Sequence, residues 1–162
     1  MGARHADAFF APLQDDALYQ WISMDKPASV EWLRARWLRN ERRMAPDGQT
    51  AWLAWAVRNK TDGIYLGRVD AEVNGALEAI NFGYYIFPSH WGRGYASEAV
   101  IAATQHLIAQ GMHRLVATVT AGNQASVRVL QKAGYEFNRI LPGNDVIRGV
   151  AVDDEEYVKA IP

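Results

Sequence analysis

The chain has 162 residues, no cysteine and a formal net charge of −1 at pH 7. The lack of cysteine excludes thiol catalysis and zinc–thiolate sites and fits a reducing compartment, while the near-zero charge gives no reason to expect nucleic acid as a partner. No signal peptide or apolar run of about 18 residues is found, so we predict a soluble, cytoplasmic protein that contacts no membrane. Because no linker or repeat interrupts the sequence, residues 1–162 are predicted to form one domain.

Hydrophobic spacing and turn residues predict alternating helices and strands along the chain. Helices are expected over residues 3–21, 29–44, 95–110 and 123–133, and strands over residues 52–57, 64–73, 78–87, 115–120, 135–140 and 148–159. Ser29 can cap the second helix, and Gly111 and Gly134 are expected to end the third and fourth. The last strand is expected to close the sheet, and a turn at Asn74 and Gly75 is expected to join two of the earlier strands.

A glycine-rich turn joins an aromatic strand, residues 84–87, to an alanine-rich helix that begins near Ala96. Gly92 and Gly94 lie where the strand becomes a helix. The unpaired N–H groups of a helix start, together with small residues that let a ligand approach the backbone, form an anion site that Arg93 can strengthen. A simple turn in which glycine only supplies positive φ is the alternative. The turn lacks the further residues of a dinucleotide fingerprint or a P-loop.

Two motifs in this chain resemble those of the GNAT acyltransferases, and within them the RimJ/RimL-like branch of ribosomal-protein N-terminal acetyltransferases. Residues 91–96, Trp-Gly-Arg-Gly-Tyr-Ala, are similar to the family's Gln/Arg-x-x-Gly-x-Gly/Ala signature, with Trp at the first position. Residues 123–135 are similar to the branch's Asn-x-x-Ser element, which ends in Gly-Tyr here. Two motifs in the right order and spacing are far more specific than either alone.

The resemblance implies an α+β fold of three layers, in which a mixed, mostly antiparallel twisted sheet carries helices on both faces. Members of the family usually begin with a strand before the first helix, and this strand is apparently missing here. The edge formed by residues 52–57 is then open. A partner chain in a homodimer and a start assigned too late are both left as explanations.

The resemblance also implies acetyl-coenzyme A as co-substrate, direct transfer of its acyl group to an amine acceptor, and no metal. The implied cofactor-binding residues are Ile86, Phe87, Trp91, Gly92, Arg93, Gly94, Tyr95, Ala96, Ser97, Asn123 and Ser126. Backbone N–H groups at the splayed end of the strand, Tyr85 among them, are expected to hold the thioester oxygen. Ser126 is the candidate donor to the leaving thiolate. Its alternative role is a hydroxyl bonded back to the backbone beside the Asn123 cap.

The predicted site departs from the branch's pattern at the general base. The branch often reads Glu-Ile-Gly-Tyr on the central strand, where this chain has Asn81-Phe82-Gly83-Tyr84, and Asn81 cannot accept a proton. At pH 7 a lysine-like amine is deprotonated about once in 2,500 molecules, but an α-amine about once in ten. The acceptor is therefore expected to be weakly basic, or the base lies elsewhere. Asp70, Glu72 and Glu78 are alternatives.

Three clusters of residues have both a structural and a functional interpretation. Five tryptophans in the first third can line an acceptor pocket or pack in the core: Trp21, Trp32, Trp37, Trp52 and Trp55. Five arginines can be solvated or can dock RNA or an acidic substrate: Arg34, Arg36, Arg39, Arg42 and Arg43. The acidic residues 153–156 suggest a surface turn or a means of steering a cationic amine.

The sequence therefore predicts an acetyl-CoA-dependent N-acetyltransferase that acts on the α-amine of a protein N-terminus. An enzyme acting on a small amine, such as an amino acid, a polyamine or an antibiotic, is one alternative. A non-catalytic acyl-CoA-binding module is the other, because Asn81 replaces a carboxylate.

Overall fold

A six-stranded sheet in the order β1-β2-β3-β4-β6-β5 forms the centre of the computed structural model, which describes residues 1–46 and 48–161. Its strands are β1 (Thr50–Arg58), β2 (Tyr65–Asn74), β3 (Glu78–Ile86), β4 (Arg114–Thr120), β5 (Glu136–Ile147) and β6 (Val150–Ala160). The α-helices are α1 (Ala6–Phe10), α2 (Val30–Asn40), α3 (Tyr95–Ala109) and α4 (Gln124–Lys132). The predicted mixed, mostly antiparallel sheet is confirmed.

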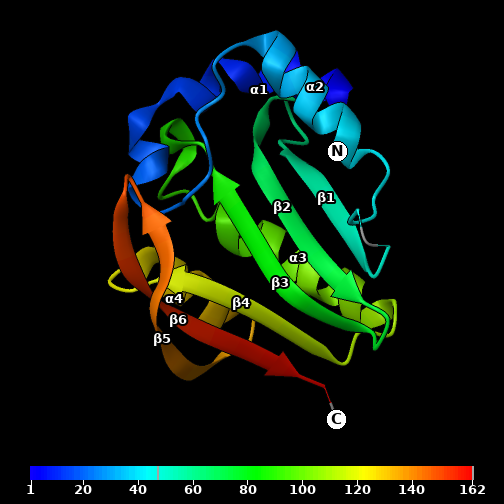
Figure 1. Cartoon of the computed structure of the whole chain (residues 1–162), viewed down its shortest axis with the longest axis vertical. Helices are drawn as coiled ribbons and strands as arrows, with labels where there is room; N and C mark the ends of the chain where they lie inside the picture. Colours follow the sequence, from blue (N-terminus) through cyan, green and yellow to red (C-terminus); the bar gives the residue numbers. More distant parts are fainter. Residues whose placement is uncertain (47, 162) are drawn as a thin grey trace.

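The central strands β3 and β4 diverge soon after they begin. They are parallel and pair only at Glu78 with Arg114 and at Ala79 with Leu115, whereas the other neighbouring strands are antiparallel. Figure 1 shows β3 running away from β4 along the rest of its length. The carboxyl-terminal half of β3 therefore has one edge without a strand partner.

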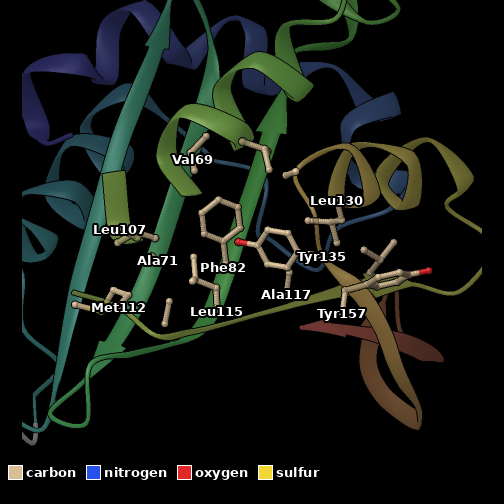
Figure 2. Close-up of a cluster of buried hydrophobic side chains, with 14 of the residues drawn as sticks. Val69, Ala71, Phe82, Leu107, Met112, Leu115, Ala117, Leu130, Tyr135 and Tyr157 are labelled. Atoms are coloured by element: carbon tan, nitrogen blue, oxygen red, sulfur yellow. The ribbon is translucent and has the colours of Figure 1, made fainter. Parts of the chain in front are cut away.

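Helices cover both faces of the sheet, as predicted. α3 and α4 lie behind it in Figure 1, and α1 and α2 lie at the top of the view, over the ends of β1 and β2. Phe82, Leu115 and Leu130 belong to the cluster under α3 and α4, which Figure 2 shows in close-up. Phe9 and Trp37 belong to a second cluster under α1 and α2. Burying one such side chain stabilises the fold by about 1.5–3 kcal/mol.

The predicted helix over residues 3–21 is wrong in detail. α1 ends at Phe10, and short 3-10 turns follow at Pro12–Gln14 and Asp16–Gln20. Pro12 has no N–H to donate, and the Asp15 carboxylate accepts a hydrogen bond from Ala17 N and starts a new turn.

α2 begins where the sequence predicts and ends four residues early. Ser29 caps it, because its Oγ accepts a hydrogen bond from Trp32 N at 3.1 Å. The helix ends at Asn40, and Arg43 then adopts a left-handed φ of 54°. The two predicted glycine stops agree with the structure. Gly111 and Gly134 both have positive φ, and a single residue separates each of them from the end of α3 or α4.

Two expectations about the last strands are wrong. β6 lies between β4 and β5, so the final strand is an interior strand and β5 forms the sheet edge. The acidic residues 153–156 lie within β6 and not in a surface turn. Asp154 and Glu156 are only 4% and 7% exposed, and Glu156 is satisfied by Arg139 and Asn138. A carboxylate paired in this way has little capacity to steer a cation.

The edge at β1 is partly covered by the chain itself. No strand precedes β1 in residues 1–46, as expected. However, Ala45 N donates to Thr50 O and Trp52 N donates to Arg43 O, each at 2.9 Å, so the segment after α2 pairs with the start of β1. The homodimer suggested to cover this edge stays a prediction. In the described part of the chain, no helix combines the length and apolar character needed to cross a membrane.

Candidate active site

The glycine-rich turn connects β3 to α3 and leaves backbone amides bare. Gly92 and Gly94 have φ of 75° and 82°, and a Cβ added at either would meet no atom within 4 Å. The first helical hydrogen bond runs from Glu98 N to Gly94 O. The N–H groups of the three residues between them therefore have no helical acceptor and point out of the start of α3. This geometry fits an anionic ligand held close to the backbone.

Trp91 fixes this turn onto the end of β3. Its indole Nε1 donates to Ile86 O at 2.6 Å, while Phe87 N donates to Leu66 O on β2 at 2.8 Å. Because successive residues of a strand direct their backbone groups to opposite edges, Ile86 faces the diverging side, and Tyr85 and Phe87 face β2. The amide suited to a ligand in the splay is therefore that of Ile86. The expectation of Tyr85 and Phe87 amides at this edge is wrong.

We call the hollow beside the turn the cradle pocket. Its volume is about 480 Å³. Most of the residues predicted to bind the cofactor line it: Ile86, Trp91, Gly92, Gly94, Tyr95, Ala96, Ser97, Asn123 and Ser126. Phe87 and Arg93 do not. Phe87 is buried in the cluster under α1 and α2, and Arg93 is exposed on the turn.

The cations that do line the cradle pocket are Arg128 and Lys132. Sequence reasoning missed them, although they follow Ser126 on one helix at a spacing of four residues, which places both side chains on the same face. Their charge, together with the bare amides at the start of α3, makes the pocket suitable for a phosphate-bearing ligand.

The start of α4 brings a hydroxyl pair into the splay. Asn123 Oδ1 accepts from Ser126 N at 3.1 Å, so Asn123 provides the cap. Ser126 Oγ is thereby left for a different partner, the Tyr84 hydroxyl at 2.8 Å. Burial raises the pKa of Tyr84 to about 12, which keeps this hydroxyl protonated at neutral pH. Sequence reasoning missed Tyr84, but strand alternation already places it on the same face as Phe82.

A second hollow, which we call the central pocket, lies at the other face of β3 and has a volume of about 530 Å³. Arg68 and Asp70 on β2 and Asn81, Gly83 and Tyr85 on β3 form its polar floor. Tyr84, Tyr85, Asn123 and Ser126 line both this pocket and the cradle pocket. The two pockets therefore meet at the splay.

Asp70 is the carboxylate on the β2–β3 floor of the central pocket, which Asp25, Asp145 and Asp154 also line. It pairs across the strands with Gly83, and a Cβ at Gly83 would lie 3.5 Å from Asp70 Oδ2, so glycine leaves the approach to this carboxylate open. Arg68 Nε lies 3.0 Å from Asp70 Oδ1, although its N–H is not aligned for a hydrogen bond. Asp70 therefore has a neighbouring cation and remains one-third exposed.

The other predicted carboxylates are occupied. Glu72 accepts hydrogen bonds from Trp52 Nε1 at 3.0 Å and from Thr50 Oγ1 at 3.1 Å. Glu78 accepts from Asn74 Nδ2 in the hairpin that joins β2 to β3. Asn81 lines the central pocket without offering a carboxylate.

Tyr85 places a second hydroxyl between the pockets. The residue is 8% exposed, and its hydroxyl oxygen is buried with no hydrogen-bond partner among the described residues. Burial raises the pKa of Tyr85 well above its usual value, so the hydroxyl stays protonated. A buried hydroxyl without a partner is costly, and a ligand that accepts its proton would relieve that cost.

The tryptophans serve both of the purposes that the sequence allowed. Trp21, Trp32 and Trp37 line the central pocket, and Trp37 is also buried in the cluster under α1 and α2. Trp55 instead packs its ring edge-to-face on His106 at 5.9 Å. Among the described residues, no group of three His, Asp or Glu side chains could hold a metal ion.

A family model described as an acetyltransferase (GNAT) domain matches residues 1–136. Two Bacillus subtilis (strain 168) proteins are 29% identical to this chain. The probable N-acetyltransferase YjcK aligns over 85% of this chain and 76% of its own length. The uncharacterized protein YkkB aligns over 72% of this chain, which spans 66% of that protein, slightly less than two thirds.

Solved acetyltransferase structures share the fold over 99% of this chain. A ribosomal-protein-S5-alanine acetyltransferase from Vibrio fischeri has a TM-score of 0.83 at 18% identity and is covered over 90%. RimL, a ribosomal L7/L12 α-N-protein acetyltransferase in complex with coenzyme A, has a TM-score of 0.81 at 19% identity, and the match covers 91% of its chain. A spermidine N-acetyltransferase from Vibrio cholerae, in complex with CoA and spermine, has a TM-score of 0.82 at 16% identity, and the match covers 92% of its chain.

Proposed function

The chain belongs to the acetyltransferase (GNAT) family and carries its acetyl-CoA-dependent N-acetyltransferase domain, and we propose that residues 1–162 acetylate the α-amine of a protein N-terminus. One observation carries the proposal. The cradle pocket, with its bare amides, meets at the splay a central pocket whose β2–β3 floor holds the carboxylate of Asp70. A donor and an acceptor can therefore approach each other there from opposite sides.

The residues of the cradle pocket fit coenzyme A. The amides of Tyr95, Ala96 and Ser97 suit the pyrophosphate, and Arg128 and Lys132 can add charge-assisted contacts. The splayed edge of β3 suits the extended pantetheine arm, which needs backbone partners along its length. Bound there, acetyl-CoA supplies the thioester that is the acetyl donor.

Four of the chain's groups would act on the transfer. The Ile86 amide donates a hydrogen bond to the thioester oxygen as negative charge develops on it. The acceptor nitrogen forms a bond to the carbonyl carbon, and the carbon–sulfur bond breaks with its electron pair on sulfur. Ser126 Oγ donates a proton to that sulfur and regains one from the Tyr84 hydroxyl, 2.8 Å away, which takes its replacement proton from solvent water. Asp70 takes the proton that the acceptor nitrogen releases, directly or through one water.

The nature of the base supports a weakly basic acceptor. Asp70 is the carboxylate on the pocket floor, and Asn81 stands where the family's branch often has glutamate. An α-amine, which is already deprotonated in about one molecule in ten at pH 7, needs less help than a lysine-like or polyamine nitrogen.

Of the three similar solved structures, two are named as ribosomal-protein acetyltransferases and one as a spermidine acetyltransferase, and these acceptors define the alternatives to test. The experiment measures thiol release from acetyl-CoA with peptides bearing a free N-terminus, the same peptides with a blocked N-terminus and one internal lysine, and spermidine. We expect turnover of the free N-termini alone. Turnover of spermidine or free amino acids in preference to peptides would favour the small-amine alternative. Saturable coenzyme A binding without turnover of any amine would leave the non-catalytic module.

A further inference from the structure

A third hollow, which we call the arginine pocket, adjoins the central pocket and has a volume of about 790 Å³. It lies between the end of α2, the segment that follows α2, and the strands β1 and β2. Arg36, Asn40, Arg68, Asp70 and Asn81 line both pockets. The proposed base therefore stands in the wall shared by the two, and an acceptor whose amine reaches Asp70 must extend its following residues along one of them.

The arginine pocket carries an excess of positive charge. Five arginines line it: Arg36, Arg39, Arg42, Arg43 and Arg68. The two carboxylates that line it are already engaged, Asp70 by Arg68 and Glu72 by hydrogen bonds from β1. The nearby Glu41 accepts a hydrogen bond from Ala3 N. Among the described residues, carboxylates pair only with Arg36 and Arg68 of the five.

Three of these arginines have no acidic partner within residues 1–46 and 48–161: Arg39, Arg42 and Arg43. Their neighbours on α2 contrast with them, because Arg34 binds both carboxylate oxygens of Asp7 and Arg36 reaches Asp25 at 3.4 Å. Within the described residues, Arg34 and Arg36 are therefore paired, although Arg36 lines the pocket, whereas Arg39, Arg42 and Arg43 line it without an acidic partner.

The backbone holds the arginines in place at some cost. Arg43 occupies the left-handed region, at φ 54°, where glycine or asparagine would be less strained. Its N–H donates to Asn40 O at 3.0 Å and its carbonyl accepts from Trp52 N at 2.9 Å. These two bonds turn the chain from the end of α2 onto the edge of β1, which keeps the arginines over the pocket.

We propose that the arginine pocket binds carboxylates of the acceptor, so that the preferred substrate is a polypeptide with acidic residues among the first few positions after its α-amine. This rests on the proposed function. The guanidinium group presents a planar fork that matches a carboxylate with two hydrogen bonds. The same charge repels a polyamine. A peptide is favoured over RNA because the pocket is continuous with the central pocket, where the acceptor amine reacts.

The test compares three peptides with the same N-terminal alanine at saturating acetyl-CoA. Positions two to four are acidic in the first, the corresponding amides in the second and lysine in the third. We expect kcat/KM to be roughly tenfold higher for the acidic than for the amide peptide, the scale of one charge-assisted hydrogen bond, and lowest for the lysine peptide. Added salt should reduce the difference.

Variants locate the effect. Arg39→Gln/Arg43→Gln should remove the preference, so that the kcat/KM values for the acidic and the amide peptide become equal in this variant. Arg34→Gln is the matched control, because Arg34 lies on the same helix but pairs with Asp7 outside the pocket, and it should keep the preference. Equal kcat/KM for acidic and amide peptides, or an undiminished preference in the double variant, would overturn the proposal.

Calorimetry with an acidic peptide whose N-terminus is already acetylated separates this proposal from the proposed function. Binding that is lost in Arg39→Gln/Arg43→Gln supports the pocket even if no α-amine is turned over, in which case only the proposed function fails. Turnover of all three peptides at equal rates keeps the proposed function and removes the pocket. If the protein binds a single-stranded RNA oligonucleotide and the acidic peptide does not displace this RNA, the proposal that the arginine pocket binds acceptor carboxylates is also contradicted.

Discussion

The hydroxyl of Tyr84 on β3 lies 2.8 Å from Oγ of Ser126 on α4 and 3.2 Å from the Ser126 carbonyl oxygen, so hydrogen bonds join the two elements that border the splay. This contact gives Ser126 a protonated partner and leaves helix capping to Asn123. The arrangement suits a hydroxyl that donates a proton and must regain it.

Removing the hydroxyl pair should slow turnover without weakening donor binding. We expect Ser126→Ala to lower kcat by about 10², and Tyr84→Phe to lower it less, because Tyr84 acts through Ser126. Steady-state kinetics with a saturating amine would measure both, with Ser89→Ala as a control outside the three pockets. Full activity in Ser126→Ala would exclude the proton donation.

The bare backbone at Gly94 should be needed for donor binding. Gly94→Ala places a methyl group where the ligand approaches and strains a φ of 82°, so the Kd for acetyl-CoA should rise by roughly tenfold or more. Gly143→Ala is the control. It strains the backbone comparably, since Gly143 has φ 59° and equally open surroundings in β5. Calorimetry should find the control unchanged, and equal weakening in both variants would point to strain alone.

Charge reversal should matter more on α4 than on the turn. Arg128 lines the cradle pocket and Arg93 does not, so Arg128→Glu should raise the KM for acetyl-CoA more than Arg93→Glu does. The reason is that a carboxylate at position 128 would lie closer to the ligand's phosphates. The reverse order, measured with one saturating acceptor, would return Arg93 to the role that the sequence suggested.

Asp70→Asn keeps the shape of the side chain and removes its ability to accept a proton. We expect kcat/KM for a peptide α-amine to fall by about 10² or more, and the loss to shrink as the pH rises and the amine deprotonates unaided. Glu78→Gln is the control, because Glu78 is bound within the β2–β3 hairpin. A pH–rate profile identical to that of the unaltered chain would exclude Asp70.

Alkaline pH should unfold the protein through its buried tyrosines. Burial raises the pKa of Tyr84 and of Tyr135 from 10 to about 12. The folded state therefore holds protons that the unfolded state loses first, so the contribution of these tyrosines to the free energy of unfolding should be constant well below pH 10 and fall between pH 10 and 12. Urea titrations at several pH values should show a smaller fall for Tyr84→Phe/Tyr135→Phe. An equal fall would assign the effect to other groups.

Local patterns predicted the part of the site that depends on local conformation. The strand, the glycine turn and α3 follow from propensities within about fifteen residues, and the Ser29 and Asn123 caps follow from side chains next to helix starts. The helix predicted over residues 3–21 failed because Pro12 and Asp15 interrupt an otherwise helical spacing. The place of β6 inside the sheet could not be read locally, because strand order depends on pairing between distant segments.

The sequence by itself determined a glycine-rich cradle between residues 84 and 97 and a helix cap at Asn123, because glycine conformation, strand alternation and helix capping are decided by neighbouring residues. Only the tertiary structure decided that Asp70, and not Glu72 or Glu78, reaches the central pocket, that Tyr84 meets Ser126, and that unpaired arginines gather beside the acceptor. Strand register and the divergence of β3 from β4 set these encounters, and both arise from packing between segments far apart in the chain.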